Sequence, residues 1–88
     1  MFKTSESNVE ASRLLREILR ETRISAQLKQ ADLANLLGSY PSFVSKYESG
    51  ERRLDVIELS QVCKALNITV NYVLNEIDNR SGRGNNAP

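Results

Sequence analysis

The stretch that decides the fold is residues 28–54, LKQADLANLLGSYPSFVSKYESGERRL. Its first part, Leu28–Leu37, carries apolar residues at a spacing of three or four, which is typical of an amphipathic helix. Gly38 follows, and glycine is the residue that most readily takes the left-handed conformation after a helix. This part therefore predicts a short helix that stops at a glycine.

A second short helix is expected from Pro41 to Ser49, closed by Gly50. Proline suits the first position of a helix because its missing N–H would have no partner there. Val44 and Tyr47 form the stripe that faces inward. Small or polar residues are left on the outer side: Ser42, Ser45, Lys46 and Ser49.

More helices are needed around this pair, since helices this short are not stable alone in water. Upstream, Ser7 and Glu10 match a capping box, with a hydroxyl at the N-cap and a carboxylate three residues later. A first helix is therefore expected to begin at this box. Its apolar stripe is predicted at Leu15, Ile18, Leu19 and Thr22.

Two helices are predicted downstream. Asp55 and Glu58 repeat the capping box before a helix that ends near Leu66, and Thr69 caps a last helix over Val70–Glu76. The residues expected to pack inward from these helices are Val56, Leu59, Val62, Cys63, Leu66, Val70, Val73 and Leu74, with Tyr72 as a further candidate.

The expected fold is an all-α, compact five-helix bundle. The chain has 88 residues, which is too few for a second hydrophobic core, and no segment alternates with the period of a strand. We predict a polar N-terminal tail at residues 1–8, the domain at 9–77 and a disordered tail at 78–88.

Composition argues against most catalytic and metal-binding classes. The sequence has no histidine and a single cysteine, Cys63, so imidazole bases and zinc sites built on His or paired Cys are excluded. Cys63 is expected to be a small buried hydrophobe. We expect no enzyme activity, no cofactor, no metal and no small-molecule ligand. Without a long apolar run or signal core, a cytoplasmic location is expected.

Residues 28–48 have the arrangement of a helix-turn-helix, whose second helix presents its N-terminal residues to the DNA major groove. The chain resembles the Cro/repressor type of helix-turn-helix regulator, also called the xenobiotic-response-element family, over about residues 19–74. The strongest similarity lies in 28–34 and 42–54. The resemblance implies a lambda-repressor-like fold in which the second and third helices bind double-stranded DNA.

Site residues follow from the resemblance by position. It implies that Pro41, Ser42, Ser45 and Lys46 face base edges, and that Gln30, Arg52 and Arg53 contact phosphates. Lys29 and Tyr40 are added as contacts to the DNA backbone. The ammonium group of lysine can bind a phosphate, and an exposed tyrosine ring can pack on the sugar-phosphate backbone. The resemblance also places Arg23 and Glu48 as a buried ion pair that holds the third helix.

The sequence departs from the family at three places. Lys29 stands where Ser or Thr commonly caps the second helix, so that cap is lost. Gln27 stands where glycine usually ends the first helix, which predicts a strained or differently shaped end. Tyr40 and Pro41 replace small polar residues at the start of the recognition helix, and Pro41 could read a base only by apolar contact or shape.

We therefore expect a bacterial or phage transcription regulator, acting as a repressor, that binds a palindromic operator as a homodimer and is associated with the nucleoid. Ile57 and Tyr72 are the residues predicted for the dimer surface. The alternative is a protein-interaction module of antitoxin or anti-repressor type that binds a protein partner and has weak DNA affinity.

Overall fold

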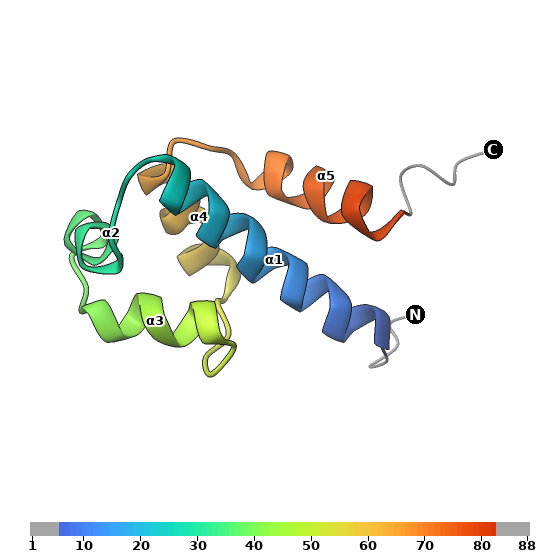
Figure 1. The fold of residues 1–88 in the computed structure, drawn as a ribbon, viewed down its shortest axis with the longest axis horizontal. Helices are drawn as coiled ribbons and strands as arrows, with labels where there is room; N and C mark the ends of the chain where they lie inside the picture. The colour runs from blue at the N-terminus through green and yellow to red at the C-terminus, as the bar shows by residue number, and fades with distance from the viewer. Residues whose placement is uncertain (1–5, 83–88) are drawn as a thin grey trace.

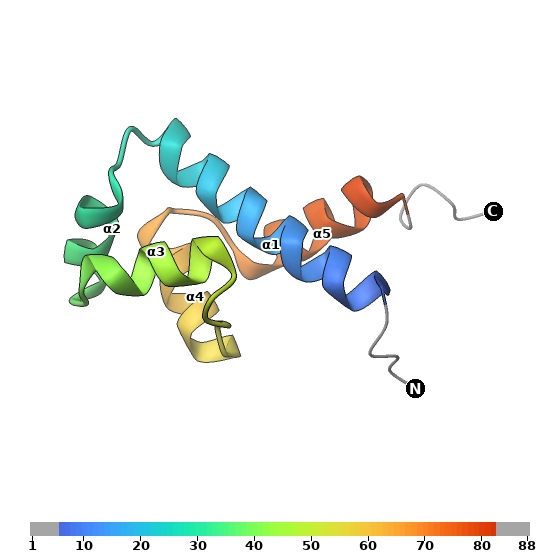
Figure 2. The same cartoon turned by 60° about the horizontal axis from the view of Figure 1, so that its bottom comes forward.

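In a computed structural model, which describes residues 6–82, the chain forms five helices and no strand within that range. They are α1 (Glu6–Ser25), α2 (Gln30–Leu37), α3 (Pro41–Ser49), α4 (Val56–Ala65) and α5 (Val70–Ser81). α1 and α5 lie side by side in opposite directions, with α2 and α3 at one end of the molecule (Figures 1 and 2). The predicted all-α fold is confirmed. Within residues 6–82, none of the helices combines the length and hydropathy that crossing a membrane demands.

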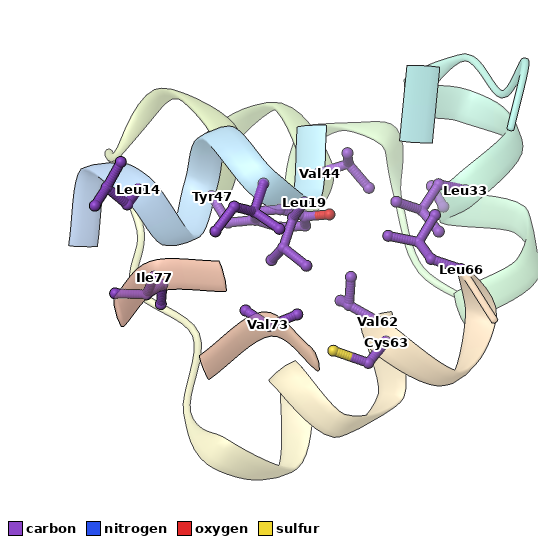
Figure 3. Close-up of a cluster of buried hydrophobic side chains, with 12 residues drawn as sticks. Leu14, Leu19, Leu33, Val44, Tyr47, Val62, Cys63, Leu66, Val73 and Ile77 are labelled. Carbon is purple, nitrogen blue, oxygen red and sulfur yellow. The ribbon is translucent and has the colours of Figure 1, made fainter. Parts of the chain in front are cut away.

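The core lies between α1, α3, α4 and α5, and α2 closes one end (Figure 3). Val44 and Tyr47 face into it from α3, and Cys63 faces into it from α4, as predicted. Burial raises the pKa of the Cys63 thiol, which keeps it in the unreactive protonated form. The other buried hydrophobic residues are Leu14, Ile18, Leu19, Leu33, Ala34, Val62, Leu66, Val73 and Ile77.

The helix ends follow local chemistry closely. Gly38 (φ 67°) and Gly50 (φ 87°) close α2 and α3 in the left-handed conformation. The Asp55 carboxylate accepts from the N–H of Glu58 at 2.8 Å, and the Thr69 hydroxyl accepts from the N–H of Tyr72 at 2.9 Å. The predicted ends of α3 and the caps of α4 and α5 are therefore confirmed.

The end of α1 has the predicted strain. Gln27 has a φ of 63°, in the left-handed region that costs a residue with a side chain free energy. The strain persists because the residue after it is held on both sides: the Leu28 N–H donates to the Arg23 carbonyl at 3.2 Å, and the Leu28 carbonyl accepts from the Arg23 side chain.

The first helix differs from its prediction at its start and in its stripe. α1 begins at Glu6, so Ser7 lies inside the helix and is not its N-cap, and residues 6–8 are helical. A first turn can lengthen by a residue or two because its N–H groups have no intrahelical partner in any case. Leu14, absent from the predicted stripe, is buried, since it lies one turn before Ile18 and near Ile77 (Figure 3).

The last helix is longer than predicted. α5 continues past Glu76 to Ser81, so residues 78–81 of the expected tail are helical. Two contacts explain the extra turn: Ile77 is buried, and the guanidinium of Arg80 lies among carboxylates of α1 and α5. The carboxylates bound by Arg80 are Glu17 (3.4 Å), Glu21 (2.9 Å) and Glu76 (3.3 Å). Residues 1–5 and 83–88 of the expected tails lie outside the described residues.

Two residues expected in the core are exposed, as is the candidate Tyr72. Val56 opens α4 and is 69% exposed, whereas the buried residues of α4 are Val62 and Cys63 in its second half. Leu74 is 50% exposed, because the buried stripe of α5 runs through Val73 and Ile77 and leaves Leu74 beside it. The prediction of inward packing was wrong for both.

Candidate nucleic-acid interface

The helices α2 and α3 pack against each other across a tight turn (Figure 2). The turn is held by backbone hydrogen bonds, from Gly38 N to Asn35 O at 3.1 Å and from Ser39 N to Ala34 O at 2.9 Å. Leu33 and Ala34 of α2 are buried together with Val44 of α3. The spacing and packing give a helix-turn-helix.

The outer side of α3, defined as Pro41, Ser42, Ser45 and Lys46, faces away from the core. Ser45 is half-buried and the other three are exposed. The Ser45 hydroxyl donates to the Ser42 carbonyl at 3.2 Å, a weak bond that a base edge could replace. Within residues 6–82, Lys46 takes part in no ion pair. Together, the proline ring, the two hydroxyl groups and the ammonium group form one strip along the first half of α3.

The inner side of α3 is tightly packed. Tyr47 is 1% exposed and lies in the core (Figure 3). Its ring meets that of Phe43 edge to face at 5.5 Å between centroids, and Phe43 is half-buried. The Tyr47 hydroxyl is buried without a hydrogen-bond partner among the described residues, and burial raises the pKa of Tyr47 far above its ordinary value. Packing therefore holds the inner side of α3 in place and leaves one buried polar atom, the Tyr47 hydroxyl oxygen, without a hydrogen bond among the described residues.

Arg23 and Glu48 meet in the interior, where α1 contacts the end of α3. Arg23 Nε donates to Glu48 Oε2 at 2.7 Å and Nη2 donates to Oε1 at 3.1 Å, a bidentate geometry. The two side chains are only 9% and 4% exposed. These hydrogen bonds raise the pKa of Arg23, although burial opposes the rise. The structure thus places the predicted pair in direct contact.

Glu48 also has a partner that sequence reasoning missed. Gln30, at the start of α2, donates from Nε2 to Glu48 Oε1 at 3.0 Å. The contact joins both helices of the motif to α1, since Arg23 holds the same carboxylate. One of the two N–H donors of the Gln30 amide is thus bound inside the protein, and the second N–H remains for the predicted phosphate contact, which stays a prediction.

Three of the residues predicted to contact the DNA backbone are exposed: Lys29, Tyr40 and Arg53. Lys29 precedes α2, and its backbone N–H donates to the Asp32 carboxylate at 2.8 Å while its own side chain makes no cap, as expected. Tyr40 precedes α3 and is 78% exposed. Arg53 is exposed and has no ion pair in the described part of the chain.

Arg52, also predicted to contact phosphate, is bound within the protein. Its guanidinium pairs with Glu58 at 2.6 Å and lies over the Phe43 ring. The hydrogen bonds from Arg52 and from the Asp55 backbone lower the pKa of Glu58 to about 2. The one sequence signal for this pair was the position of Glu58 in a capping box, which places its carboxylate at the start of α4.

Known proteins share this sequence pattern and this fold. Residues 19–73 match the sequence model of a helix-turn-helix family. The chain belongs to the Cro/repressor-type, or XRE, family of helix-turn-helix proteins. It is similar to a solved structure, an XRE-family like protein from Pseudomonas syringae pv. tomato str. DC3000, with 38% identity, a TM-score of 0.74, and coverage of 84% of this chain and 89% of the other. Curated protein sequences give no match.

Family membership makes this XRE-family chain a DNA-binding transcription regulator whose partner is double-stranded DNA. The family match begins at Leu19 and ends at Val73, so the first half of α1 and the end of α5 lie outside it. Arg80, at the end of α5, pairs with Glu17 outside the family match and with Glu21 inside it. Within residues 6–82, no group of three Cys, Asp or Glu side chains is placed to hold a metal ion.

Proposed function

We propose that this XRE-family regulator reads specific DNA sequence through the outer side of α3, and that it acts as a repressor by occupying promoter DNA in a bacterial or phage system, in the cytoplasm. The observation that carries the proposal is the contrast across α3: Glu48 and Tyr47 are buried, whereas Ser42 and Lys46 are exposed. A recognition helix needs this arrangement, because a rigid inner side lets the outer residues meet base edges without prior reordering.

Each residue on the outer side of α3 has a proposed role in recognising DNA sequence. Lys46 can reach the O6 and N7 atoms of guanine, Ser42 and Ser45 can donate to or accept from any base, and Pro41 can contact a thymine methyl group. The residues proposed for phosphate contact are Lys29, Gln30, Tyr40 and Arg53. These contacts set affinity and orientation but carry no sequence information directly.

The test is selection of bound duplexes from a random library at near-physiological salt. The proposal predicts an enriched motif with two-fold symmetry, whose half-sites are about one helical turn apart, as for other dimeric helix-turn-helix proteins. Binding that shows no preferred sequence and collapses as salt rises would mean that only phosphates are contacted, and would reject sequence reading.

The homodimer is proposed to form through the exposed residues Ile57 (64% exposed) and Tyr72 (45% exposed) on α4 and α5. Ile57→Asp is expected to shift the mass in solution and on DNA toward the monomer, because an unpaired charge would be buried in the interface. Ile24→Asp on α1 is a matched control, since Ile24 is an exposed isoleucine as well, with an exposed fraction of 50%. An unchanged mass for Ile57→Asp, or a monomer for the unmodified protein on and off DNA, would contradict the proposed surface.

The second candidate function is binding of a protein partner, as in an antitoxin or anti-repressor. A groove of about 570 Å³ between the first half of α1 and the loop after α3 favours it. Val9 and Leu54 line the groove together with three arginines, and none of its lining residues is acidic. If the library selection yields no motif, this candidate replaces sequence reading.

A further inference from the structure

A cluster of three side chains ties α3 to α4 beyond the outer side of α3. Arg52 donates from Nη2 to Glu58 Oε2 at 2.6 Å and from Nη1 to Glu58 Oε1 at 2.9 Å. Its guanidinium carbon lies 4.9 Å from the centroid of the Phe43 ring. These three residues, called the Arg52 cluster, connect the first turn of α3, the following loop and the first turn of α4.

The donors of Arg52 are largely used inside the protein. An arginine has five N–H donors, and Nη1 here also donates to the Arg53 carbonyl at 2.9 Å, in addition to the two bonds to Glu58. The facing carboxylate neutralises the charge. Two N–H donors remain, on Nε and Nη2, but the paired carboxylate of Glu58 reduces the attraction of Arg52 for a phosphate.

Glu58 is itself fixed by the backbone of α4. Its Oε1 accepts from the Asp55 N–H at 3.0 Å, and its own N–H donates to Asp55 Oδ1 at 2.8 Å. The carboxylate is thus held by contacts that do not involve Arg52. Arg52 in turn contacts the ring of Phe43, which lies between Ser42 and Val44 on α3.

We propose that Arg52 is a positioning residue for DNA reading: together with Glu58 it sets the placement of the first turn of α3 through Phe43, and it is not a phosphate contact. This inference rests on the proposed reading of DNA by the outer side of α3. Arg53, adjacent and exposed, remains the phosphate contact of this loop.

The test compares four variants on two duplexes, one with the selected operator and one of unrelated sequence, over a range of salt concentrations. The variants are Glu58→Gln, Arg52→Gln, Arg52→Lys and the control Arg53→Gln. Glutamine keeps the capping box at Glu58, because its amide oxygen still accepts from the Asp55 N–H. Circular dichroism and thermal unfolding establish that each variant is folded at the temperature of the binding experiment.

Glu58→Gln decides the question because the two roles predict changes of opposite sign in operator affinity. If Arg52 positions α3, Glu58→Gln and Arg52→Gln both weaken operator binding by about 3- to 30-fold. The affinity for the unrelated duplex and the slope of log affinity against log salt concentration stay unchanged. Arg52→Lys does not rescue, because lysine lacks the planar fork. Arg53→Gln weakens binding to both duplexes and lowers the salt slope by about one.

Tighter or unchanged operator binding by Glu58→Gln would overturn the proposal, since it would mean that Glu58 competes with phosphate or does not matter. Full activity of Arg52→Lys with a reduced salt slope for Arg52→Gln would do the same. In both cases the unmodified protein still prefers its operator, and the proposed function stands. If the unmodified protein prefers no sequence, both the proposed function and this inference fail.

Discussion

The two sides of α3 differ in how firmly the protein holds them. On the inner side, Tyr47 and Glu48 are enclosed by the core and by Arg23, at distances as short as 2.7 Å. On the outer side, Lys46 is exposed and has no ion pair within residues 6–82. This difference suits a short recognition helix. Contacts on the inner side fix the position of α3, so that binding DNA does not have to order it.

Firm holding is not the same as maximal stability. The ion pair of Arg23 and Glu48 is desolvated, and a buried pair often adds little over apolar residues of the same size. The buried Tyr47 hydroxyl without a partner is a net cost. The inner side therefore gives α3 a defined geometry, and its individual contacts should differ widely in their effect on stability.

The largest effect is expected from Arg23→Ala. The substitution leaves the Glu48 carboxylate buried without its main partner, so the free energy of unfolding should fall by about 3–5 kcal/mol. For a domain of this size each kcal/mol corresponds to about 4–8 °C in Tm. Urea and thermal unfolding measure both quantities.

Arg13→Ala is the control for that experiment. Arg13 pairs with Glu17 at 3.3 Å on the surface, so its loss should change stability by less than about 1 kcal/mol. Similar losses for the two variants would mean that the inner side of α3 is no more tightly held than the surface.

The next effect concerns the outer side. Lys46→Ala should leave the free energy of unfolding within about 0.5 kcal/mol of the unmodified protein, because Lys46 is exposed. It should weaken operator binding by about 1–3 kcal/mol and relax the preference at one position in each half-site. Titration of duplexes that differ at single positions measures this. A uniform loss at all positions would make Lys46 a phosphate contact.

A smaller effect, of opposite sign, is expected from Tyr47→Phe. Removing the unpaired hydroxyl should raise the free energy of unfolding by up to about 1 kcal/mol, since the ring keeps its packing against Phe43. Tyr72→Phe is the control, because Tyr72 is 45% exposed and its hydroxyl can bind water. A destabilised Tyr47→Phe would show that the hydroxyl has a hydrogen-bond partner in solution.

The smallest effect comes from the loop beside the outer side of α3. The pKa of Glu58 is lowered to about 2, so its pairing with Arg52 stabilises the folded state above the unfolded pKa and is lost as pH falls toward 2. The stability difference between the unmodified protein and Glu58→Gln should therefore be constant above about pH 5.5 and shrink below about pH 4.5. Urea unfolding from pH 6 to pH 2.5 measures it. A pH-independent difference would rule out the ion pair as its cause.

The helix-turn-helix could be predicted because its signals are local. Gly38 and Gly50 end helices since they tolerate positive φ, and Pro41 begins one since it needs no N–H partner there. Asp55 and Thr69 cap the helices that follow through contacts three residues away. Such effects depend on neighbours in the chain and not on the rest of the fold.

Most of the missed contacts join residues distant in the chain. Gln30 and Glu48 are 18 positions apart, and Arg80 is 63 positions from Glu17. Arg52 and Glu58 are only six apart, but an irregular loop separates them, so no helical spacing predicts that they meet. Periodicity indicates which side of a helix is apolar, but it cannot say how far the packing extends. Val56 was therefore expected in the core although it is exposed.

Local chemistry in the chain was thus sufficient for the five helices and most of their ends, and the motifs it places resemble the family and suggest which side of α3 is proposed to meet DNA. Packing in three dimensions decided which polar groups are already bound: Gln30 by Glu48, Arg80 by α1, and Arg52 by Glu58. The physical reason is that helix formation and capping act over a few residues, whereas desolvation and ion pairing depend on whatever the folded chain brings within a few ångströms.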